Sequence, residues 1–207
     1  SRRQRQMCIR DRLYGAYDKK GELLIFSKEL PDGNYTNEME GYRYNKQEVP
    51  AGSEWSCSTD IPLLRYSEVL LMKAECLLRT NQSGAGELVT EVRKRAFKAD
   101  PSKATVTDDE LKENSSYQWG VVENYQITDR GNQDPIEFGR LFDERCWEFV
   151  WEGYTRRDMI RFGIFCKKSW LSHKPQGDHR IVFPIPQRAV DANPKLTQNP
   201  ALSLIHI

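Results

Sequence analysis

Apolar residues recur with a helical period in the segment that follows Asp60. Asp60 is a suitable N-cap and Pro62 lies near the first turn, so both residues favour a helix start at this point. The apolar positions are spaced by three and four residues and share one helix face: Leu63, Tyr66, Leu70, Ala74, Leu77 and Leu78. The pattern predicts an amphipathic helix from Pro62 to Arg79.

A second helical pattern follows a short polar turn from Asn81 to Gly86. Its apolar positions are Leu88, Val89, Val92 and Ala96, and Pro101 limits its extent. Two helices joined by a short glycine-containing turn form a helical hairpin of about 35 residues, the size of one tetratricopeptide-like unit. Because no second copy of this period is visible, the pattern alone predicts a single hairpin.

The other segments alternate between polar stretches and short helical patterns. Residues 13–60 read as loops with short extended pieces, and residues 100–134 as a long loop after a short helix near 107–113. The helical period returns after Pro135, with Gly153 as its stop, on the face formed by Phe138, Leu141, Phe142, Arg145 and Phe149. A short helix is predicted over 155–165, while prolines in 183–200 predict an extended, non-helical tail. The predicted fold class is therefore mainly α with long irregular connections.

Composition and charge narrow the function classes. The chain has 31 Lys and Arg residues against 30 Asp and Glu, and a net charge of +1 argues against a nucleic-acid-binding surface. No window approaches the roughly 18 consecutive apolar residues that a membrane helix needs. The 8 Phe, 5 Trp and 9 Tyr residues can bury enough surface for one hydrophobic core.

The two ends differ from the rest of the chain. Residues 1–12 are basic and lack the apolar segment that a signal peptide requires, and residues 202–207 form an apolar tail with no turn or helix pattern. We interpret both ends as non-native leader and tail around a partial reading frame, and expect residues 13–201 to be the genuine protein.

A dense group of charged residues occupies the third helical pattern and the short helix after it. Glu144, Glu148 and Glu152 lie at i, i+4 and i+8, so they share one helix face. Paired carboxylates can hydrolyse glycosides, but that reaction needs them on opposite sides of a sugar ring. Arg157 and Arg161 on an antiparallel helix could instead pair with Glu148 and Glu152. We therefore predict a structural ion-pair network of Glu144, Arg145, Glu148, Glu152, Arg157, Asp158 and Arg161.

The sequence contains no signature of an enzyme. The histidines His173, His179 and His206 do not form a zinc motif, and His173 and His179 read better as solvated loop residues than as metal ligands. Neither a nucleophile elbow nor a phosphate-binding glycine loop is present. The predictions are no catalytic residue, no metal and no cofactor.

Aromatic residues in the predicted loops suggest a carbohydrate site. Flat rings can cover the C–H faces of a sugar, and neighbouring amides and carboxylates can bind its hydroxyls. The candidates, chosen by residue type and placement, are Trp55, Tyr117, Trp119 and Tyr125. The alternative is that these rings only attach the loops to the helical core. Replacing Trp119 by alanine is expected to weaken oligosaccharide binding if the ring contacts ligand.

Four motifs follow one another along about residues 60–200. They are LRYSEVLLMKAECLL, EVRKRA, DERCWEFVWEGYTRRDMIRFG and FPIPQRAVDANPKLTQNP. With these motifs in this order, the chain resembles the C-terminal part of the SusD/RagB family of outer-membrane nutrient-binding lipoproteins. The ending is the most specific of the four. Family members usually continue with Gly-Tyr after the last Asn-Pro, where this chain has Ala201.

This resemblance implies a helical scaffold of tetratricopeptide-like hairpins and a binding function without chemistry. Such proteins bind glycans, or peptides in some members, at the surface of Gram-negative bacteria. They pass the ligand to a SusC-like TonB-dependent transporter and are held in the outer membrane by a lipidated N-terminal cysteine. The charged residues from Glu144 to Arg161 match the family's structural pattern, whereas its ligand contacts come from variable loops and do not transfer. Residues 13–201 are accordingly expected to be the C-terminal part of the nutrient-binding domain, with the anchor upstream.

Two other function classes remain open from the residues. A tetratricopeptide-like module could bind a protein partner, and a glycoside hydrolase could use Glu144 or Glu148. Sugar binding without release of reducing sugar would separate capture from hydrolysis. A pulldown with a β-barrel transporter would separate capture from a general interaction module.

Overall fold

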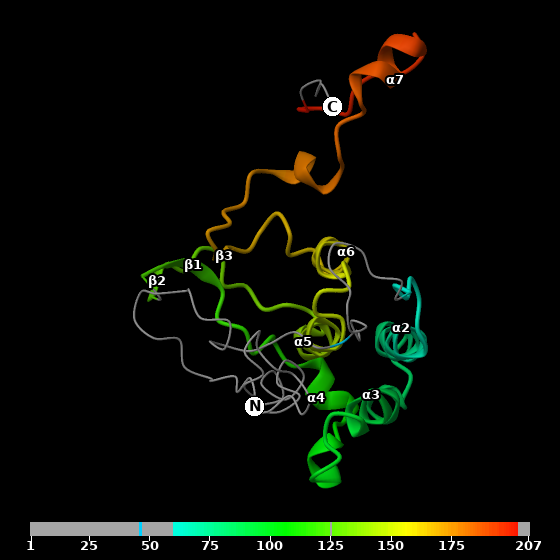
Figure 1. Cartoon of the computed structure of the whole chain (residues 1–207). Coiled ribbons are helices and arrows are strands. Elements are labelled where there is room, and N and C mark those ends of the chain that lie inside the picture. The colour runs from blue at the N-terminus through cyan, green and yellow to red at the C-terminus, as the bar shows by residue number, and fades with distance from the viewer. Residues whose placement is uncertain (1–45, 47–59, 125, 203–207) are drawn as a thin grey trace, which may run out of the picture. The chain divides into compact units, whose positions relative to one another are not determined.

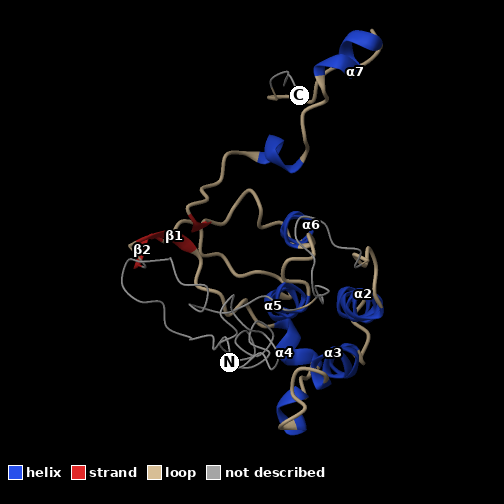
Figure 2. Ribbon diagram, in the orientation of Figure 1, coloured by secondary structure: helices blue, strands red, loops and turns tan. Residues whose placement is uncertain are grey.

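The computed structural model describes residue 46, residues 60–124 and residues 126–202. These residues fall into two compact units that divide between Asp108 and Asp109. Helix is the dominant secondary structure and the strands form one small sheet (Figures 1 and 2). The prediction of a mainly α fold is confirmed. No helix in the described ranges is both long and apolar enough to cross a bilayer.

The first unit contains the helical hairpin. Helix α2 spans Tyr66–Arg79 and α3 spans Ala85–Lys94, and the two helices are in contact. Asn81 and Gly84, with φ of 54° and 102°, turn the chain between them in the left-handed region. The buried apolar residues of the hairpin are Leu71, Ala74, Leu78, Ala85, Val89 and Val92. Each lies on the side of its helix that faces the core of this unit.

Helix α2 begins four residues later than its predicted start at Pro62. Arg65 is extended, with φ of −138° and ψ of 160°, and forms the N-cap. Leu63 and Tyr66 were placed on the apolar face but are 89% and 73% exposed. The buried face instead includes Glu68 and Glu75, and Arg79 donates to Glu75 at 2.9 Å. Apolar residues therefore lie on more than one side of α2, and their spacing alone could not select the buried side.

The backbone at the start of α3 lies close against the segment that follows this helix. A 3-10 helix spans Pro101–Ala104, and α4 spans Asp108–Lys112. Asp108 accepts hydrogen bonds from the backbone N–H groups of Gly84 and Gly86 at the start of α3. A Cβ at Gly86 would lie 2.9 Å from the carbonyl carbon of Thr107, so a side chain does not fit there. The predicted short helix near 107–113 is confirmed as α4.

The second unit contains a three-stranded sheet that the sequence analysis did not predict. Strand β1 spans Gly120–Glu123, β2 spans Gln126–Asp129 and β3 spans Trp170–Leu171. The order is β2-β1-β3, with β1 antiparallel to β2 and parallel to β3, and with a register shift between Val121 and Val122. The prediction of one long loop over 100–134 was wrong. Its β-branched residues Val121, Val122 and Ile127 are few, and pairing with β3 joins segments about 50 positions apart along the sequence.

Two helices carry the core of the second unit. Helix α5 spans Gly139–Glu148 and α6 spans Thr155–Arg161. Phe138, at φ of 54°, precedes α5, and Gly153, at φ of 79°, lies in the turn before α6. The core cluster is formed by Trp119, Ile136, Phe142, Met159 and Ile164. Both predicted helices are confirmed, although α6 ends four residues before the predicted end.

The proline-rich tail contains helix after all. A 3-10 helix spans Asp178–Ile181, and α7 spans Gln187–Ala192 directly after Pro186. A proline blocks helix on its N-terminal side, but its fixed φ, here −56°, suits the start of a helix. The prediction of a non-helical tail over 183–200 was therefore wrong for Gln187–Ala192, whereas the 3-10 helix lies before that range.

Candidate functional site

The segment that carries Tyr117 and Trp119 is attached to α5 through Asp143. This carboxylate is 4% exposed and accepts a hydrogen bond from the hydroxyl of Ser115 at 2.6 Å. It also accepts hydrogen bonds from the backbone N–H and the hydroxyl of Ser116, both at 2.7 Å. Hydrogen bonds to a carboxylate are stronger than those between neutral groups. Asp143 therefore determines where the aromatic residues after Ser116 enter the unit.

Trp119 lies in the core cluster and is 7% exposed. Its ring centroid is 4.9 Å from that of Tyr117 and 6.2 Å from that of Trp170, both in edge-to-face arrangements. The ring of Phe142 on α5 lies 6.3 Å away. A ring enclosed by other aromatic rings has little surface for a sugar. Its surroundings correspond to the alternative that this residue attaches its segment to the core.

Tyr117 is half-buried and packs against the edge of the same cluster. It is the described glycan-binding candidate that keeps appreciable exposed surface. The other two candidates, Trp55 and Tyr125, lie outside the described residues. The structure thus brings Tyr117 and Trp119 together, but as neighbours in one aromatic cluster.

Asp158 on α6 is a buried carboxylate that is surrounded by three arginines, of which only Arg145 is fully buried. Arg145 on α5 donates to Asp158 through Nε at 2.8 Å and through Nη2 at 3.1 Å, and the two side chains are 0% and 2% exposed. Arg161 donates through Nη2 at 2.9 Å, and Nε of Arg157 lies 3.8 Å away. The planar guanidinium of Arg145 forms a bidentate pair that fixes how α5 and α6 meet.

The glutamates of the predicted network are enclosed or lie at the edge of the helices. Glu144 and Glu148 are each 1% exposed, and Glu152 is half-buried. A glycosidase needs two carboxylates that reach a sugar ring from opposite sides. Carboxylates as enclosed as Glu144 and Glu148 do not offer that access, so their placement does not favour hydrolysis.

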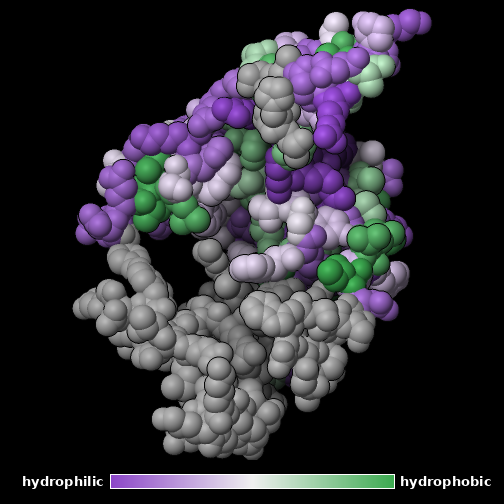
Figure 3. Space-filling model, turned by 45° about the horizontal axis from the view of Figure 1, so that its top comes forward, coloured by the Kyte–Doolittle hydropathy of each residue, from purple (hydrophilic) through white to green (hydrophobic). Residues whose placement is uncertain are grey.

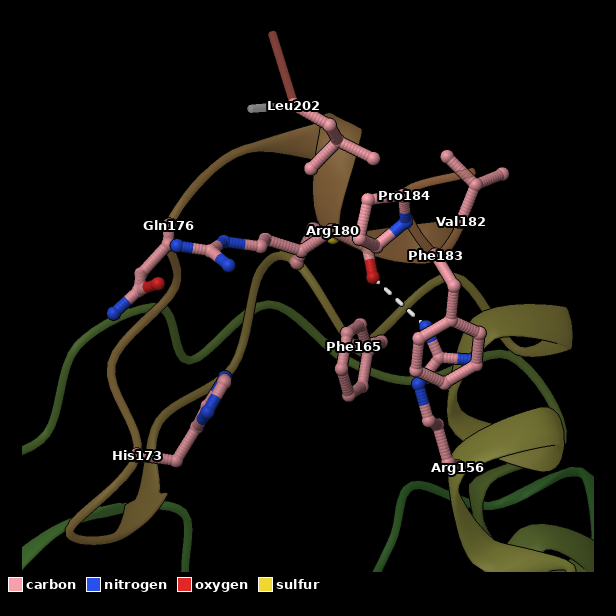
Figure 4. Close-up of a pocket in the computed structure, with 10 residues that line it drawn as sticks. Arg156, Phe165, His173, Gln176, Arg180, Val182, Phe183, Pro184 and Leu202 are labelled. Atoms are coloured by element: carbon pink, nitrogen blue, oxygen red, sulfur yellow. Dashed lines mark hydrogen bonds between the residues drawn. The ribbon is translucent and has the colours of Figure 1, made fainter. Parts of the chain in front are cut away.

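A solvent-facing pocket of about 270 Å³ lies between α6, β3 and the tail (Figure 4). Its residues come from three segments that are separate in the sequence. They are Arg156, Phe165, Cys166, His173, Gln176, Arg180, Val182, Phe183, Pro184 and Leu202. The pocket therefore combines aromatic rings, two guanidinium groups and an amide.

Arg156 connects α6 to the tail on one side of this pocket. Its Nη2 donates to the backbone carbonyl of Arg180 at 2.9 Å (Figure 4). The same nitrogen donates to the backbone carbonyl of Ile181 at 3.1 Å. Its guanidinium carbon lies 5.0 Å from the ring centroid of Phe165 and 4.3 Å from that of Phe183. These cation–π contacts hold both rings at the pocket wall.

His173 and Cys166 also line the pocket. The ring of His173 stacks on Trp170 at 3.7 Å and lies 5.7 Å from Phe165, so the expectation of a solvated loop histidine was wrong. Burial, with a smaller contribution from Asp178, raises the pKa of the Cys166 thiol above its ordinary value, although Arg156 acts in the opposite direction. No cluster of metal-binding side chains occurs among the residues with described positions.

Comparison with known proteins identifies the family. The sequence model of the SusD family matches residues 14–180, which is most of the chain. The chain belongs to the SusD family. The resemblance inferred from the four motifs is therefore confirmed, and this SusD-family chain has the mostly helical fold expected of it.

Two curated relatives show the extent of the similarity. The chain is 29% identical over 147 residues to SusD-like protein P25 of Formosa agariphila, which covers 67% of this chain and 23% of that protein. It is 27% identical over 164 residues to starch-binding protein SusD of Bacteroides thetaiotaomicron, covering 75% of this chain and 24% of the relative. This SusD-family chain thus spans about a quarter of the length of either relative.

The structure explains the ending motif of this SusD-family chain. The side-chain amide of Gln198 accepts from the N–H of Ile185 at 2.8 Å and donates to the carbonyl of the same residue at 2.9 Å. Nδ2 of Asn199 donates to the carbonyl of Phe183 at 2.7 Å. The Gln-Asn pair therefore closes the tail onto its Phe-Pro-Ile-Pro segment and positions Phe183 at the pocket.

The sequence analysis did not predict the pocket, because its lining residues come from separate segments of the chain. Arg156 was read only as part of a charged helix, and Phe183 only as part of a motif. The available signal was Phe183, an aromatic residue that directly precedes Pro184 in the tail. Its neighbours Phe165 and Arg156 in the pocket are distant in sequence and are brought to it only by folding.

Proposed function

We propose that this protein captures glycans at the surface of a Gram-negative cell and does not alter them chemically. Membership of the SusD family supports this proposal most directly. One relative, of which this chain covers about a quarter, is named a starch-binding protein. Glycan capture agrees with the enclosed carboxylates and with a surface pocket that offers rings and hydrogen-bond donors.

We further propose that the captured oligosaccharide passes to a SusC-like TonB-dependent transporter in the outer membrane. In this proposal the protein is a surface lipoprotein and meets the membrane only through its lipid anchor. Hydrophobic residues on the face shown in Figure 3 lie in separate green patches within a mainly hydrophilic surface. The exposed apolar residues Leu63, Leu64 and Tyr66 next to and at the start of α2 are available for helix packing on a protein partner.

Two measurements test the proposal. Calorimetric titration of the full-length protein with neutral oligosaccharides is expected to show binding, and the same mixtures are expected to release no reducing sugar. A tagged full-length protein is expected to retain a β-barrel transporter from solubilised outer membranes. Release of reducing sugar would favour a hydrolase, and retention of soluble proteins without sugar binding would favour a general interaction module.

A further inference from the structure

The pocket between α6, β3 and the tail contains hydrogen-bond donors that the described protein does not use. The guanidinium of Arg180 and the side-chain amide of Gln176 make no hydrogen bond or ion pair with any other described residue. Arg156 uses Nη2 for two backbone carbonyls, and its Nε and Nη1 have no partner in the same ranges. In Figure 4 the side chain of Arg180 points toward the end of the pocket where Gln176 lies. Such donors require acceptors, which solvent or a ligand must provide.

The walls of the pocket are aromatic. Phe165 lies between His173 and Arg156. Its ring centroid is 5.7 Å from that of His173 and 5.0 Å from the guanidinium carbon of Arg156. Phe183, which is 70% exposed, covers the outer side of Arg156. An exposed aromatic ring that is held in place costs little conformational entropy when a flat ligand packs on it. The wall therefore suits the C–H face of a sugar ring.

Charge narrows the class of sugar. Among the described residues that line the pocket, Arg156 and Arg180 are cationic and none carries a carboxylate. Asp178 is the acidic side chain close enough to raise the pKa of Cys166, and it lies outside the lining. The pocket is consequently positive, and a planar guanidinium binds a carboxylate or a sulfate through two parallel hydrogen bonds.

We propose that this pocket binds an acidic sugar unit, with its carboxylate or sulfate ester on Arg180 and its ring against Phe183. The volume of about 270 Å³ is near the lower end of ordinary ligand pockets and suits a single unit of a longer chain. The inference rests on the proposed capture of glycans and specifies its substrate class. Gln176 supplies a second donor for the acidic group, and Arg156 keeps the aromatic wall in place.

The test uses the full-length protein and matched monosaccharides. Glucuronate, glucose 6-sulfate, glucose and acetate are titrated by calorimetry into the native protein and into three variants. R180Q removes the proposed anion contact, and R188Q removes an exposed arginine on α7 that does not line the pocket. F183A removes the proposed stacking surface. All three positions are exposed, so the variants are expected to remain folded.

At least one acidic sugar is expected to bind in the millimolar range, and about tenfold more tightly than glucose or acetate. R180Q is expected to reduce that affinity about tenfold, the loss expected for a charge-assisted pair. R188Q is expected to leave the affinity unchanged. F183A is expected to weaken binding of the acidic sugar without altering binding of acetate. Preference for glucuronate or for glucose 6-sulfate would identify the acidic group.

Three results would overturn the inference. They are the absence of acidic-sugar binding up to about 20 mM, equal affinity for glucose, and equal losses in R180Q and R188Q. A parallel titration with neutral oligosaccharides separates this failure from failure of glycan capture. If neutral oligosaccharides bind while acidic units show no preference, only the acidic pocket is rejected. If no saccharide binds, both proposals are rejected.

Discussion

The substitution Asp158→Asn is expected to lower the free energy of unfolding more than substitution of either arginine on α6 that lies next to it. Asp158 is 2% exposed and accepts two hydrogen bonds from Arg145 and one from Arg161. Asparagine has nearly the same shape but carries no charge. The variant therefore leaves the fully buried guanidinium of Arg145 without its counter-charge, while the packing around it changes little.

The magnitude follows from the burial of the pair. Removing one member of a buried ion pair costs about 3–5 kcal/mol because the other charge remains in a medium of low polarity. That loss is a large part of the roughly 5–15 kcal/mol that stabilises an ordinary domain. Arg157 is 55% exposed and 3.8 Å from the carboxylate, so Arg157→Gln is expected to cost only about 0.5 kcal/mol.

Urea unfolding of both variants, followed by tryptophan fluorescence and by circular dichroism, measures the difference. A second comparison uses the double replacement of Arg145 by methionine and Asp158 by leucine, which removes both charges. Replacing a buried pair by apolar residues is often neutral, so the double variant is expected to recover most of the stability lost in Asp158→Asn. Equal stabilities of Asp158→Asn and Arg157→Gln would refute the structural role of the pair.

Three further predictions concern other described residues. Trp119→Ala is expected to cost about 3–5 kcal/mol through a cavity in the core cluster, and weaker glycan binding at unchanged stability would instead identify the ring as a ligand contact. Burial holds the pKa of Lys168 below its ordinary value of 10.5 despite the opposing effect of Asp134. The unfolded chain then binds more protons than the folded one between the two pKa values, so this group makes stability rise with pH across that window. Lys168→Met is expected to lose this rise, and parallel pH profiles would contradict the assignment. A Cβ at Gly139 would lie 2.7 Å from the carbonyl carbon of Asn114, so Gly139→Ala is expected to cost about 1–3 kcal/mol, measured by urea unfolding.

Helical elements were the most predictable part of this protein. The periods around α2, α3, α5 and α6 were recognised because helix patterning depends on residues three and four positions apart. Boundaries were less predictable, as α2 shows by starting at Tyr66 and not at Pro62. The family was also recognisable, because its motifs lie within continuous segments of sequence.

The candidate site was less predictable because its contacts join distant segments. Trp119 is of a residue type that often binds sugars, but the rings of Phe142 and Trp170 pack against it in the core. The sheet needs pairing of β1 with β3, and a local pattern does not contain that partner.

The sequence by itself determined the helical class of the chain, its family and the presence of charged helices near residue 150. Tertiary structure decided that Asp158 accepts Arg145 and Arg161, and that Phe165, Arg180 and Phe183 line one pocket. The physical reason is that the spacing of apolar residues along the sequence indicates only which side of a helix or strand is apolar. Burial, ion pairing and the lining of a pocket depend on which other element packs against that side.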